Sequence, residues 1–340
     1  MAEADQRGDP SEDGLIARHF APLSQNFPGA FGLHDDAAVI ALPDGAKLVV
    51  TTDALIAGVH FLPDDTPSDI AYKALAVNVS DLAAKAARPL AYSLALALAR
   101  GWREEWLAGF AEGLRQAQRA FGIDLCGGDT TISPAGPLMV SITAFGSVPS
   151  GRMVRRGGAR PGDLLFVTGT IGDAALGLKL RRGDADARGW PLDEAACRYL
   201  IGRYLRPEPR LGLREALLAH ASAAMDISDG LVIDCGRMCA ASRVGGSIEA
   251  GQVPLSTPAQ TLISADAGAF ERVMAGGDDY EILAAIRPAE VQAFETAAHG
   301  AGISVTRIGE IGMQAGEMSV IDPDGQPVRF ARPGYDHLAP

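Results

Sequence analysis

Short apolar segments alternate with longer segments of helical periodicity along the first half of the chain. Apolar segments that are β-branched or strictly alternating predict strands. Segments of this kind cover residues 37–42, 47–52, 91–99 and 138–145. Apolar positions at helical spacing predict one helix capped by Ser68-Asp69 that runs to about Lys85, and another over residues 104–121. This order of elements indicates an α/β or α+β fold.

The stretch over residues 146–163, GSVPSGRMVRRGGARPGD, is rich in glycine, proline and arginine. It predicts a domain boundary, with an N-terminal α/β domain over residues 1–150 and a C-terminal α/β domain over residues 151–340. In the second domain we expect strands at 164–168, 247–250, 280–286 and 304–310, and helices from about 173 and at 195–205, 210–221, 231–243 and 289–298. Residues 181–194 indicate a polar surface loop, and Asp322-Pro323-Asp324-Gly325 predicts a hairpin turn.

Composition places the chain among ordinary globular proteins. Its 340 residues are 47% apolar and 21% charged, which favours two domains over one small core and argues against disorder. The longest apolar run, near residues 92–99, is too short to span a bilayer. The start, MAEADQRGDPSEDG, is acidic and polar, unlike a secretory signal or a transit peptide.

The four cysteines lack the Cys-x-x-Cys spacing of zinc sites and are expected to be reduced and mostly buried. They are Cys126, Cys197, Cys235 and Cys239. Reduced cysteines and an acidic start favour a cytoplasmic location. The net charge of −12 argues against a general nucleic-acid or anionic-membrane surface, and it means that any bound polyphosphate needs local cations.

Six short segments place acidic or hydroxyl side chains at the end of an apolar run or beside glycine. They are HDDAAVI (Asp35, Asp36), TTD (Thr51, Thr52, Asp53), NVSD (Asn78, Ser80, Asp81), GGDTT (Asp129), MDISDG (Asp226, Ser228, Asp229) and GGDDYE (Asp278, Asp279, Glu281). Such positions let the backbone approach a ligand closely. Carboxylate and hydroxyl oxygens are ligands of Mg²⁺, which keeps waters and shares substrate phosphates. We expect a metal and phosphate site in which the strand over residues 47–52 ends at the oxygen ligands, with His60 just beyond.

Each segment also has a purely structural interpretation. Ser228 or Asp229 could cap the helix that follows, and Asp81 could pair with Lys85 on a helix surface. GGDTT could be a simple turn, and His60, between two apolar residues, could be a core histidine. The occurrence of six such segments in one chain is what favours a site over isolated caps and turns.

Glycine-rich loops add a weaker signal. The sequence contains no G-x-x-x-x-G-K-[ST] motif and no complete dinucleotide fingerprint after a strand. Arg155 and Arg156, next to Gly157-Gly158, could offer a guanidinium to an ATP phosphate, or they could form a solvated basic loop at a domain boundary.

In their order along the chain, these motifs resemble those of the bacterial thiamine-monophosphate kinases, within the aminoimidazole ribonucleotide synthetase-like superfamily. The similar motifs are DDAAV, TTD-x₆-H, AYKALAVNVSDLAA, GGDT, RRGGARPGD, DISDGL, GGDDYE and GYDHLA, from about residue 15 to residue 338. Two positions depart from the family pattern: His34 stands where glycine is usual, and Asp278 stands where glutamate is usual.

The resemblance implies an N-terminal domain whose sheet pairs with that of a second subunit, giving a homodimer, and a C-terminal domain that completes the ATP and substrate site. The residues that it assigns to Mg²⁺ are Asp36, Thr51, Thr52, Asp53, Asp81, Asp129, Asp226 and Asp229. Those that it assigns to ATP are Gly128, Asp129, Arg156 and Ser228, and those for thiamine monophosphate are His60, Asp278 and Tyr335.

The implied reaction is ATP + thiamine monophosphate → ADP + thiamine diphosphate, the last step in making thiamine diphosphate, by direct in-line transfer assisted by several Mg²⁺ ions. The acceptor oxygen is already anionic, so no residue is expected to act as a general base or a covalent nucleophile. One alternative is a superfamily relative of the ligase or synthetase type that uses ATP to activate an amide or similar oxygen. The other is a metal-binding scaffold without catalysis.

Overall fold

The computed structural model describes residues 11–335 except 267 and 317. The chain divides into two compact units, unit 1 (Met1–Val79 with Pro89–Ser147) and unit 2 (Ser80–Arg88 with Val148–Pro340). Unit 2 therefore includes a short segment, Ser80–Arg88, from within the predicted first domain. The assignment of separate roles to domains 1–150 and 151–340 stays a prediction.

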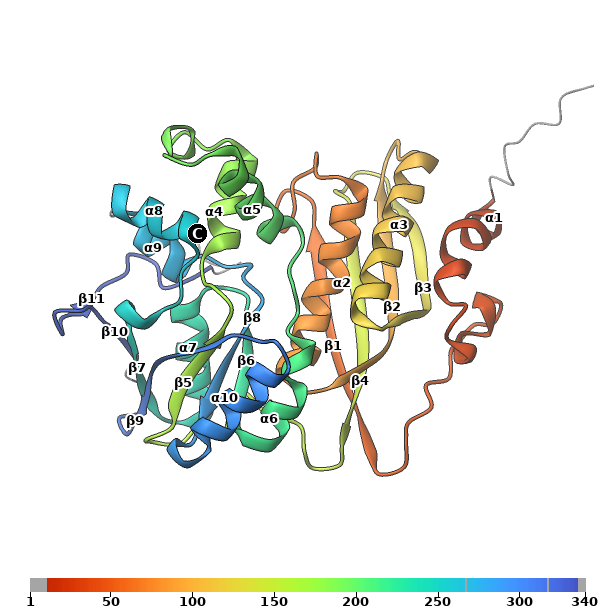
Figure 1. Cartoon of the computed structure of the whole chain (residues 1–340). Helices are drawn as coiled ribbons and strands as arrows, with labels where there is room; N and C mark the ends of the chain where they lie inside the picture. The colour runs from red at the N-terminus through yellow and green to blue at the C-terminus, as the bar shows by residue number, and fades with distance from the viewer. Residues whose placement is uncertain (1–10, 267, 317, 336–340) are drawn as a thin grey trace, which may run out of the picture. The chain divides into compact units, whose positions relative to one another are not determined.

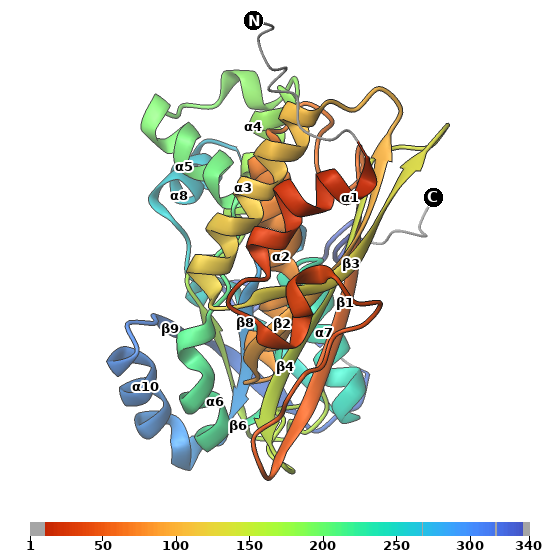
Figure 2. The ribbon, with the colours of Figure 1, turned by 90° about the vertical axis from the view of Figure 1, so that its right-hand side faces the viewer.

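Unit 1 contains a four-stranded sheet among the described residues, in the order β1-β4-β2-β3. Its strands are β1 (Ala46–Ile56), β2 (Arg88–Ala99), β3 (Asp124–Ser133) and β4 (Met139–Pro149). Its helices are α1 (Glu12–Leu15), the Pro67–Val79 part of α2 (Pro67–Ala84) and α3 (Glu104–Phe121), with single-turn helices at Ile16–Phe20, Ala21–Leu23 and Pro28–Leu33. Figures 1 and 2 show α2 and α3 against one face of this sheet.

The predicted helix over residues 104–121 is confirmed as α3, and its apolar periodicity explains its packing. The buried side chains recur at helical spacing: Leu107, Phe110, Ala111, Leu114, Ala117 and Phe121. Gly122, in the left-handed region at φ 64°, ends the helix and donates its N–H to Gln118 O. At Gly113 a Cβ would lie 2.2 Å from Ser68 O, so α3 passes very close to the start of α2.

Two local predictions in unit 1 are wrong, and one structural alternative is excluded. Residues 37–42 form no strand; this segment is irregular, with Val39 60% exposed and bonded through its N–H to Gly29 O. GGDTT lies inside strand β3, paired in parallel with β2, and is therefore not a turn. The cap of α2 is Thr66 rather than Ser68-Asp69, because the Thr66 hydroxyl accepts the Asp69 N–H and donates to its carboxylate.

Unit 2 contains, within the part that the structure describes, a seven-stranded sheet in the order β11-β10-β7-β9-β5-β8-β6. The strands are β5 (Leu164–Thr168), β6 (Ala221–Ile227), β7 (Gly245–Glu249), β8 (Glu281–Ile286), β9 (Val305–Gly312), β10 (Met318–Ile321) and β11 (Pro327–Val328). The helices are α4 (Asp173–Arg182), α5 (Glu194–Leu205), α6 (Arg214–His220), α7 (Leu231–Ser242), α8 (Thr257–Ala265), α9 (Gly268–Ala275) and α10 (Val291–Gly300). Among the described residues of this sheet, β10 pairs with β7 in parallel, and the other neighbouring strands pair antiparallel.

Helices cover both faces of the central strands of unit 2. Phe166 of β5 faces a core formed with α6 and α10, whereas its neighbours Leu165 and Val167 face a second core formed with α7. Figure 1 shows α6 and α10 in front of this sheet and α7 behind it. Strands buried on both faces appear in sequence as continuous apolar runs, which is why these strands were predictable.

The predicted α/β (α+β) class is confirmed, and most predicted elements of unit 2 are present within a few residues of their bounds. The hairpin at residues 322–325 is confirmed by the Gly325 N–H bond to Asp322 O and the antiparallel pairing of β10 with β11. The helix expected over residues 210–221 is shorter than predicted, and β6, α8 and α9 were not predicted. The four cysteines, all within the described residues, are free thiols, and three are buried as expected. No described helix is long and apolar enough to cross a membrane.

Candidate active site

Thr51, Thr52 and Asp53 lie in the middle of β1, which continues to Ile56. The expectation that the strand ends at these oxygens is therefore wrong. Because side chains alternate along a strand, Thr51 and Asp53 share one face while Thr52 lies on the other. The Thr52 hydroxyl contacts β4 through Ile142 O and the Thr143 hydroxyl, at 3.1 Å each.

Asp53 is fixed at the level of its main chain. Its N–H donates to the amide oxygen of Asn78 at 3.1 Å, and its carbonyl accepts the Ser141 hydroxyl at 3.2 Å. Asn78 is fully buried on α2 and donates in turn to Ala74 O. Asn78 of the NVSD motif thus links β1 to α2 within unit 1 and fixes the position of the strand along the helix.

His60 belongs to the turn that follows β1. Its ring Nδ1 accepts the Ile56 N–H at 3.0 Å, and its carbonyl accepts the ammonium of the buried Lys73 at 3.1 Å. Since Nδ1 is an acceptor, the neutral ring carries its proton on Nε2. The ring Nδ1, the main-chain N–H, which donates to Ile56 O at 3.0 Å, and the carbonyl therefore fix the orientation of His60 in this turn.

A cavity of about 500 Å³ in unit 1 brings together three of the predicted residues: Asp36, Gly128 and Asp129. Apolar side chains, including Ile16, Phe20, Leu33, Ile40 and Phe145, line the rest of it. At Gly128 a Cβ would lie 2.0 Å from Leu94 O, so only glycine allows β3 to approach β2 there. The cavity therefore combines an apolar wall with carboxylates at one side, as small-molecule sites often do.

In unit 2, Asp226 at the end of β6 is buried with its carboxylate facing α2. The Ser80 hydroxyl donates to it at 2.8 Å. Burial, followed by the negative charge of Asp81, raises the pKa of Asp226 to about 8. Burial also lowers the pKa of Lys85, which donates to Ala224 O at 2.7 Å. The interaction of Asp81 with Lys85 therefore belongs to a largely buried cluster with Asp226 rather than to a solvent-exposed helix surface.

The turn after β6 is held by Asp234, a residue that the sequence analysis did not single out. Its carboxylate accepts the N–H groups of Ser228 and Asp229 at 3.0 and 2.9 Å, and burial raises its pKa. Asp229 forms an ion pair with Arg237. Gly230 occupies the N-cap position of α7 without a side-chain bond, so the capping role considered for Ser228 and Asp229 is wrong.

Three predicted segments meet at this turn of unit 2. The Asp278 N–H donates to Ser228 O at 2.8 Å, and the Tyr335 N–H donates to Asp229 O at 2.9 Å. Asp278 (φ 71°) and Tyr280 (φ 51°) both adopt the left-handed conformation. For residues other than glycine this conformation costs about 1–3 kcal/mol each and is often found at functional sites. The last part of the GYDHLA motif, residues 336–339, lies outside the described residues.

The Arg155-Arg156 loop packs along the edge of the unit 2 sheet. The Ala224 N–H donates to Arg155 O at 3.0 Å, and a Cβ at Gly157 would lie 2.6 Å from Ala241 O. Arg156 is exposed, yet its charge is close enough to Lys85 to contribute to the lowered pKa of that lysine. The loop therefore holds one exposed guanidinium near the Asp226 cluster.

The donor chemistry of these residues fits Mg²⁺. Within residues 11–335, apart from the two that are not described, no group of three or more His, Cys, Asp or Glu side chains could hold a metal ion by itself. Mg²⁺ keeps several waters and is usually held by one or two carboxylates plus substrate phosphates. The Asp81–Asp226 pair, whose repulsion helps to raise a pKa, is the kind of cluster that a cation stabilises.

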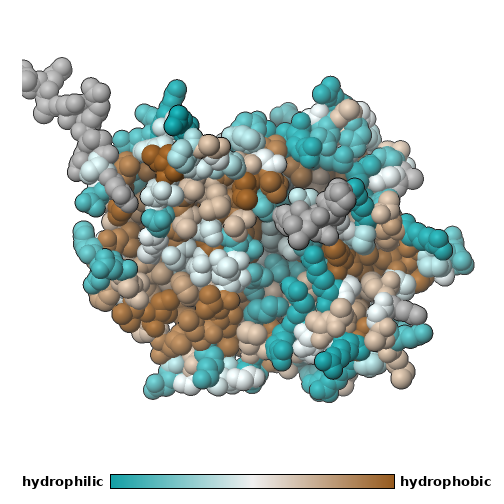
Figure 3. Space-filling model, turned by 180° about the vertical axis from the view of Figure 1, so that it is seen from behind, coloured by the Kyte–Doolittle hydropathy of each residue, from teal (hydrophilic) through white to brown (hydrophobic). Residues whose placement is uncertain are grey.

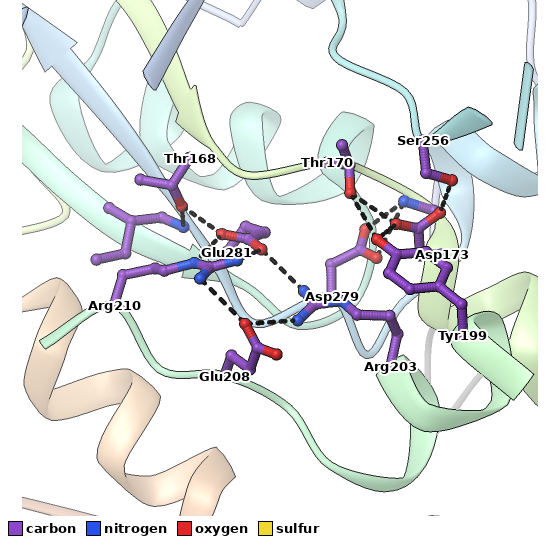
Figure 4. A network of polar contacts seen from close by, with 12 residues as sticks. Thr168, Thr170, Asp173, Tyr199, Arg203, Glu208, Arg210, Ser256, Asp279 and Glu281 are labelled. Carbon is purple, nitrogen blue, oxygen red and sulfur yellow. Dashed lines mark hydrogen bonds and ion pairs between the residues drawn. The ribbon is translucent and has the colours of Figure 1, made fainter. Parts of the chain in front are cut away.

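Several buried polar residues near the site were missed. In the polar network of Figure 4, Glu281 is bonded to Thr168, Arg203 and Arg210, and Asp173 is bonded to Thr170, Tyr199 and Ser256. The sequence carried one signal for it, because Glu281 follows two acids directly before an apolar strand. Its arginine partners come from residues more than seventy positions away, so spacing alone could not identify them.

Comparison with known proteins gives consistent matches over most of the chain. Two family models match: AIR synthase related protein, N-terminal domain, over residues 34–148, and AIR synthase related protein, C-terminal domain, over residues 160–321. The thiamine-monophosphate kinase of Caulobacter vibrioides is 42% identical over 91% of this chain and 86% of its own length.

Solved structures agree with the sequence matches. The crystal structure of thiamine-monophosphate kinase from Stenotrophomonas maltophilia K279a has a TM-score of 0.78 at 38% identity, covering 87% of this chain and 91% of that one. The structure of AaThiL complexed with AMPPCP and TMP has a TM-score of 0.75 at 29% identity and covers 99% of both chains.

Proposed function

The chain belongs to the thiamine-monophosphate kinase family, and we propose that it transfers the γ-phosphoryl group of ATP to thiamine monophosphate, releasing ADP and thiamine diphosphate. The resemblance found in the motifs is thereby confirmed. The observation that carries the proposal is the similarity, over 99% of both chains, to a structure that holds TMP together with the ATP analogue AMPPCP.

The residues suit a transfer governed by positioning and electrostatics. The attacking phosphate oxygen is anionic at neutral pH, so the reaction does not need a strong base. The barrier comes largely from bringing two polyanions together on a protein whose own net charge is −12. Bound Mg²⁺ would neutralise phosphate charge and align donor and acceptor.

We assign Mg²⁺ to carboxylate and hydroxyl oxygens in each unit. In unit 1 they are Asp36, Thr51, Thr52, Asp53 and Asp129, and in unit 2 they are Asp81, Asp226 and Asp229. Thr52 points to the opposite side of β1 from Asp53, and Asp229 is paired with Arg237, so these two are the ligands that most need a direct test.

ATP is assigned to Gly128 and Asp129 in the cavity of unit 1 and to Arg156 and Ser228 of unit 2. The apolar part of the cavity suits a nucleobase, and its carboxylate side suits metal-bound phosphates. The guanidinium of Arg156 is exposed. Its planar set of N–H donors matches the arrangement of phosphate oxygens, so it can bind a phosphate of ATP.

Thiamine monophosphate is assigned to His60, Asp278 and Tyr335. The Nε2–H of His60 can donate to the acceptor phosphate. Asp278 is acidic and one methylene shorter than the usual glutamate, so it suits the cationic thiazolium or the aminopyrimidine better than the phosphate. Tyr335 is half-exposed, and its main chain is bonded to Asp229 O, beside Asp278.

We also propose that the protein works as a homodimer through unit 1. Leu48 and Val50 of β1 are 42% and 54% exposed, Ile132 of β3 is 54% exposed, and β1 and β3 are the edge strands of the sheet. Figure 3 shows apolar side chains gathered on the left-hand part of the face in view, which belongs to unit 1. An exposed apolar sheet with open edge strands tends to aggregate unless another chain or element covers it.

The dimer is tested by Val50→Lys in analytical ultracentrifugation. We expect the wild type to sediment as a dimer at micromolar concentration and the variant to shift towards monomer. Met313→Lys, at an apolar residue of unit 2 that is 86% exposed, serves as the control and should leave the mass unchanged. An active wild-type monomer would refute the proposal.

The activity is tested by incubating the purified protein with Mg-ATP and thiamine monophosphate and identifying the products. Equal amounts of ADP and thiamine diphosphate are expected, with no turnover in EDTA. Release of free phosphate without thiamine diphosphate would favour the ligase-type alternative, and absence of ATP turnover with every acceptor would favour the scaffold. A cytoplasmic location, consistent with free thiols, belongs to the same proposal.

A further inference from the structure

Asp279 and Glu281 of the GGDDYE motif are both buried, at 2% and 0% exposure, whereas Asp278 is half-buried. Asp279 and Glu281 therefore cannot contact a ligand in the way proposed for Asp278. The assigned functions above do not use them, although Figure 4 shows each carboxylate within a network of polar contacts. Their partners indicate what they do.

Glu281 is bonded through both of its carboxylate oxygens. The Thr168 hydroxyl donates to Oε2 at 2.6 Å, Arg210 Nε donates to Oε2 at 2.7 Å, and Arg203 Nη2 donates to Oε1 at 2.8 Å. Charge-assisted bonds of this kind are stronger than neutral ones and fix orientation. A Cβ at Gly169 would lie 2.3 Å from Oε1, so the neighbouring backbone closes around the carboxylate.

Asp279 makes a second attachment from the same short segment. Both of its oxygens accept the Gly172 N–H, at 3.0 and 2.9 Å. Gly172 has φ 86°, and a Cβ there would lie 2.6 Å from Val273 Cα, so this glycine has little freedom to move. The segment is therefore attached to the loop between β5 and α4 on one side and to two arginines on the other.

The residues next to these acids, Asp278 and Tyr280, are the ones with left-handed backbone. Their N–H groups donate to Ser228 O and Ile227 O, both at 2.8 Å. A left-handed conformation at residues other than glycine persists only where the surroundings impose it. In this segment, those two main-chain bonds and the buried side-chain bonds of Asp279 and Glu281 together hold the left-handed residues.

We propose that Asp279 and Glu281 are positioning residues that hold the left-handed backbone of Asp278 and Tyr280 and thereby place the Asp278 side chain for thiamine monophosphate. This inference rests on the proposed function. It predicts that loss of either acid weakens binding of thiamine monophosphate far more than binding of ATP, while the unit 2 core stays folded.

The test compares Glu281→Gln and Asp279→Asn with a matched control, Asp163→Asn. Asp163 is also buried in unit 2 and accepts the Arg160 N–H at 2.9 Å. It precedes Leu164, which pairs with Ile286 at the far end of β8 from Glu281, so its loss should not affect the segment before β8. The first measurement is amide hydrogen exchange, which does not depend on activity. Exchange at Asp278 and Tyr280 should be at least tenfold faster in the two variants and unchanged in the control, with β5 still protected in all three.

The second measurement is steady-state kinetics with each substrate varied. We expect KM for thiamine monophosphate to rise at least tenfold and KM for ATP to change less than threefold in Glu281→Gln. Unchanged exchange at Asp278 and Tyr280 would overturn the inference, and so would equal increases in both KM values. If the wild type makes no thiamine diphosphate, the proposed function fails, and the exchange result still decides whether the two acids hold the segment. If Glu281→Gln does not fold, the milder variants Asp279→Asn and Arg210→Lys test the inference by the same exchange rates and KM values.

Discussion

The acidic residues of β1 in unit 1 and those around the β6–α7 turn in unit 2 look alike in sequence, but the structure holds them differently. Asp53 protrudes from a regular strand, and its position follows from the sheet and from one bond to Asn78. Asp226 and Asp229 follow the apolar part of β6, and Asp278 lies just before β8. Asp226 is held by Ser80 and Asp278 by Ser228, both distant in sequence, whereas Asp229 is held by the nearby Asp234.

This difference means that substitutions in β1 should affect activity without affecting stability, whereas substitutions in unit 2 should affect both. A strand residue with its backbone already paired can be changed with little effect on stability, because the ladder survives. In unit 2 the acids are buried or ion-paired, so a substitution there changes local structure or charge repulsion as well as any ligand contact. Four measurements test this contrast.

The largest effect is expected for Asp53→Asn. The variant keeps the shape and the main-chain bond to Asn78 but removes a ligand charge, so kcat should fall at least about 10²-fold, the scale of losing one key electrostatic group. The melting temperature should stay within a few degrees of the wild type. Near-normal kcat, or unfolding, would mean that the β1 oxygens are structural and that the contrast is wrong.

His60→Ala should act mainly on substrate affinity. Loss of a donor to a phosphate is worth about 1.5–3 kcal/mol, so KM for thiamine monophosphate should rise about tenfold or more, with a smaller change in KM for ATP. His60→Asn is the control, because its side-chain oxygen can still accept the Ile56 N–H and keep the turn. Rescue of KM by this control would show that His60 serves only the turn.

Asp226→Asn tests the buried side of the comparison through stability. Asn keeps an acceptor for the Ser80 hydroxyl and removes repulsion with Asp81, so in EDTA above pH 8, where Asp226 is ionised, the melting temperature should rise by about 2–4 °C, equivalent to about 1 kcal/mol. With Mg-ATP present, the wild type should gain more stability than the variant. Thermal melts in both buffers check this, and a variant that gains as much from Mg-ATP as the wild type would remove Asp226 from the metal ligands.

The smallest effect is a pH dependence from Asp279. Burial raises the pKa of this carboxyl well above its usual range. Its folded-state pKa exceeds the unfolded value of about 3.9, so its contribution to stability is complete below pH 4 and is lost as the pH rises through the folded-state pKa. Urea unfolding from pH 5 to pH 8 should therefore show the free energy of unfolding of the wild type falling relative to that of Asp279→Asn. If the two free energies change in parallel with pH, Asp279 does not contribute this pH dependence.

Local pattern was sufficient for elements that depend on their own side chains. The helix Glu104–Phe121 was placed correctly because of its helical periodicity, and the strand Leu164–Thr168 because of its apolar run. Residues 37–42 are also an apolar run but form no strand in the structure, and Val39 is left exposed. A strand needs a partner, and a single sequence does not name one.

The candidate site shows the same division at the level of residues. The motifs alone show which oxygens, glycines and cations are available, because residues such as those of DISDGL and GGDDYE occupy consecutive positions. The packed unit was needed to show that Lys85 is buried near Asp226 and that Glu281 is held by Arg203 and Arg210. These bonds join residues brought together by chain folding, and burial, which sets their strength and their pKa values, is a property of the whole packed unit rather than of any local segment.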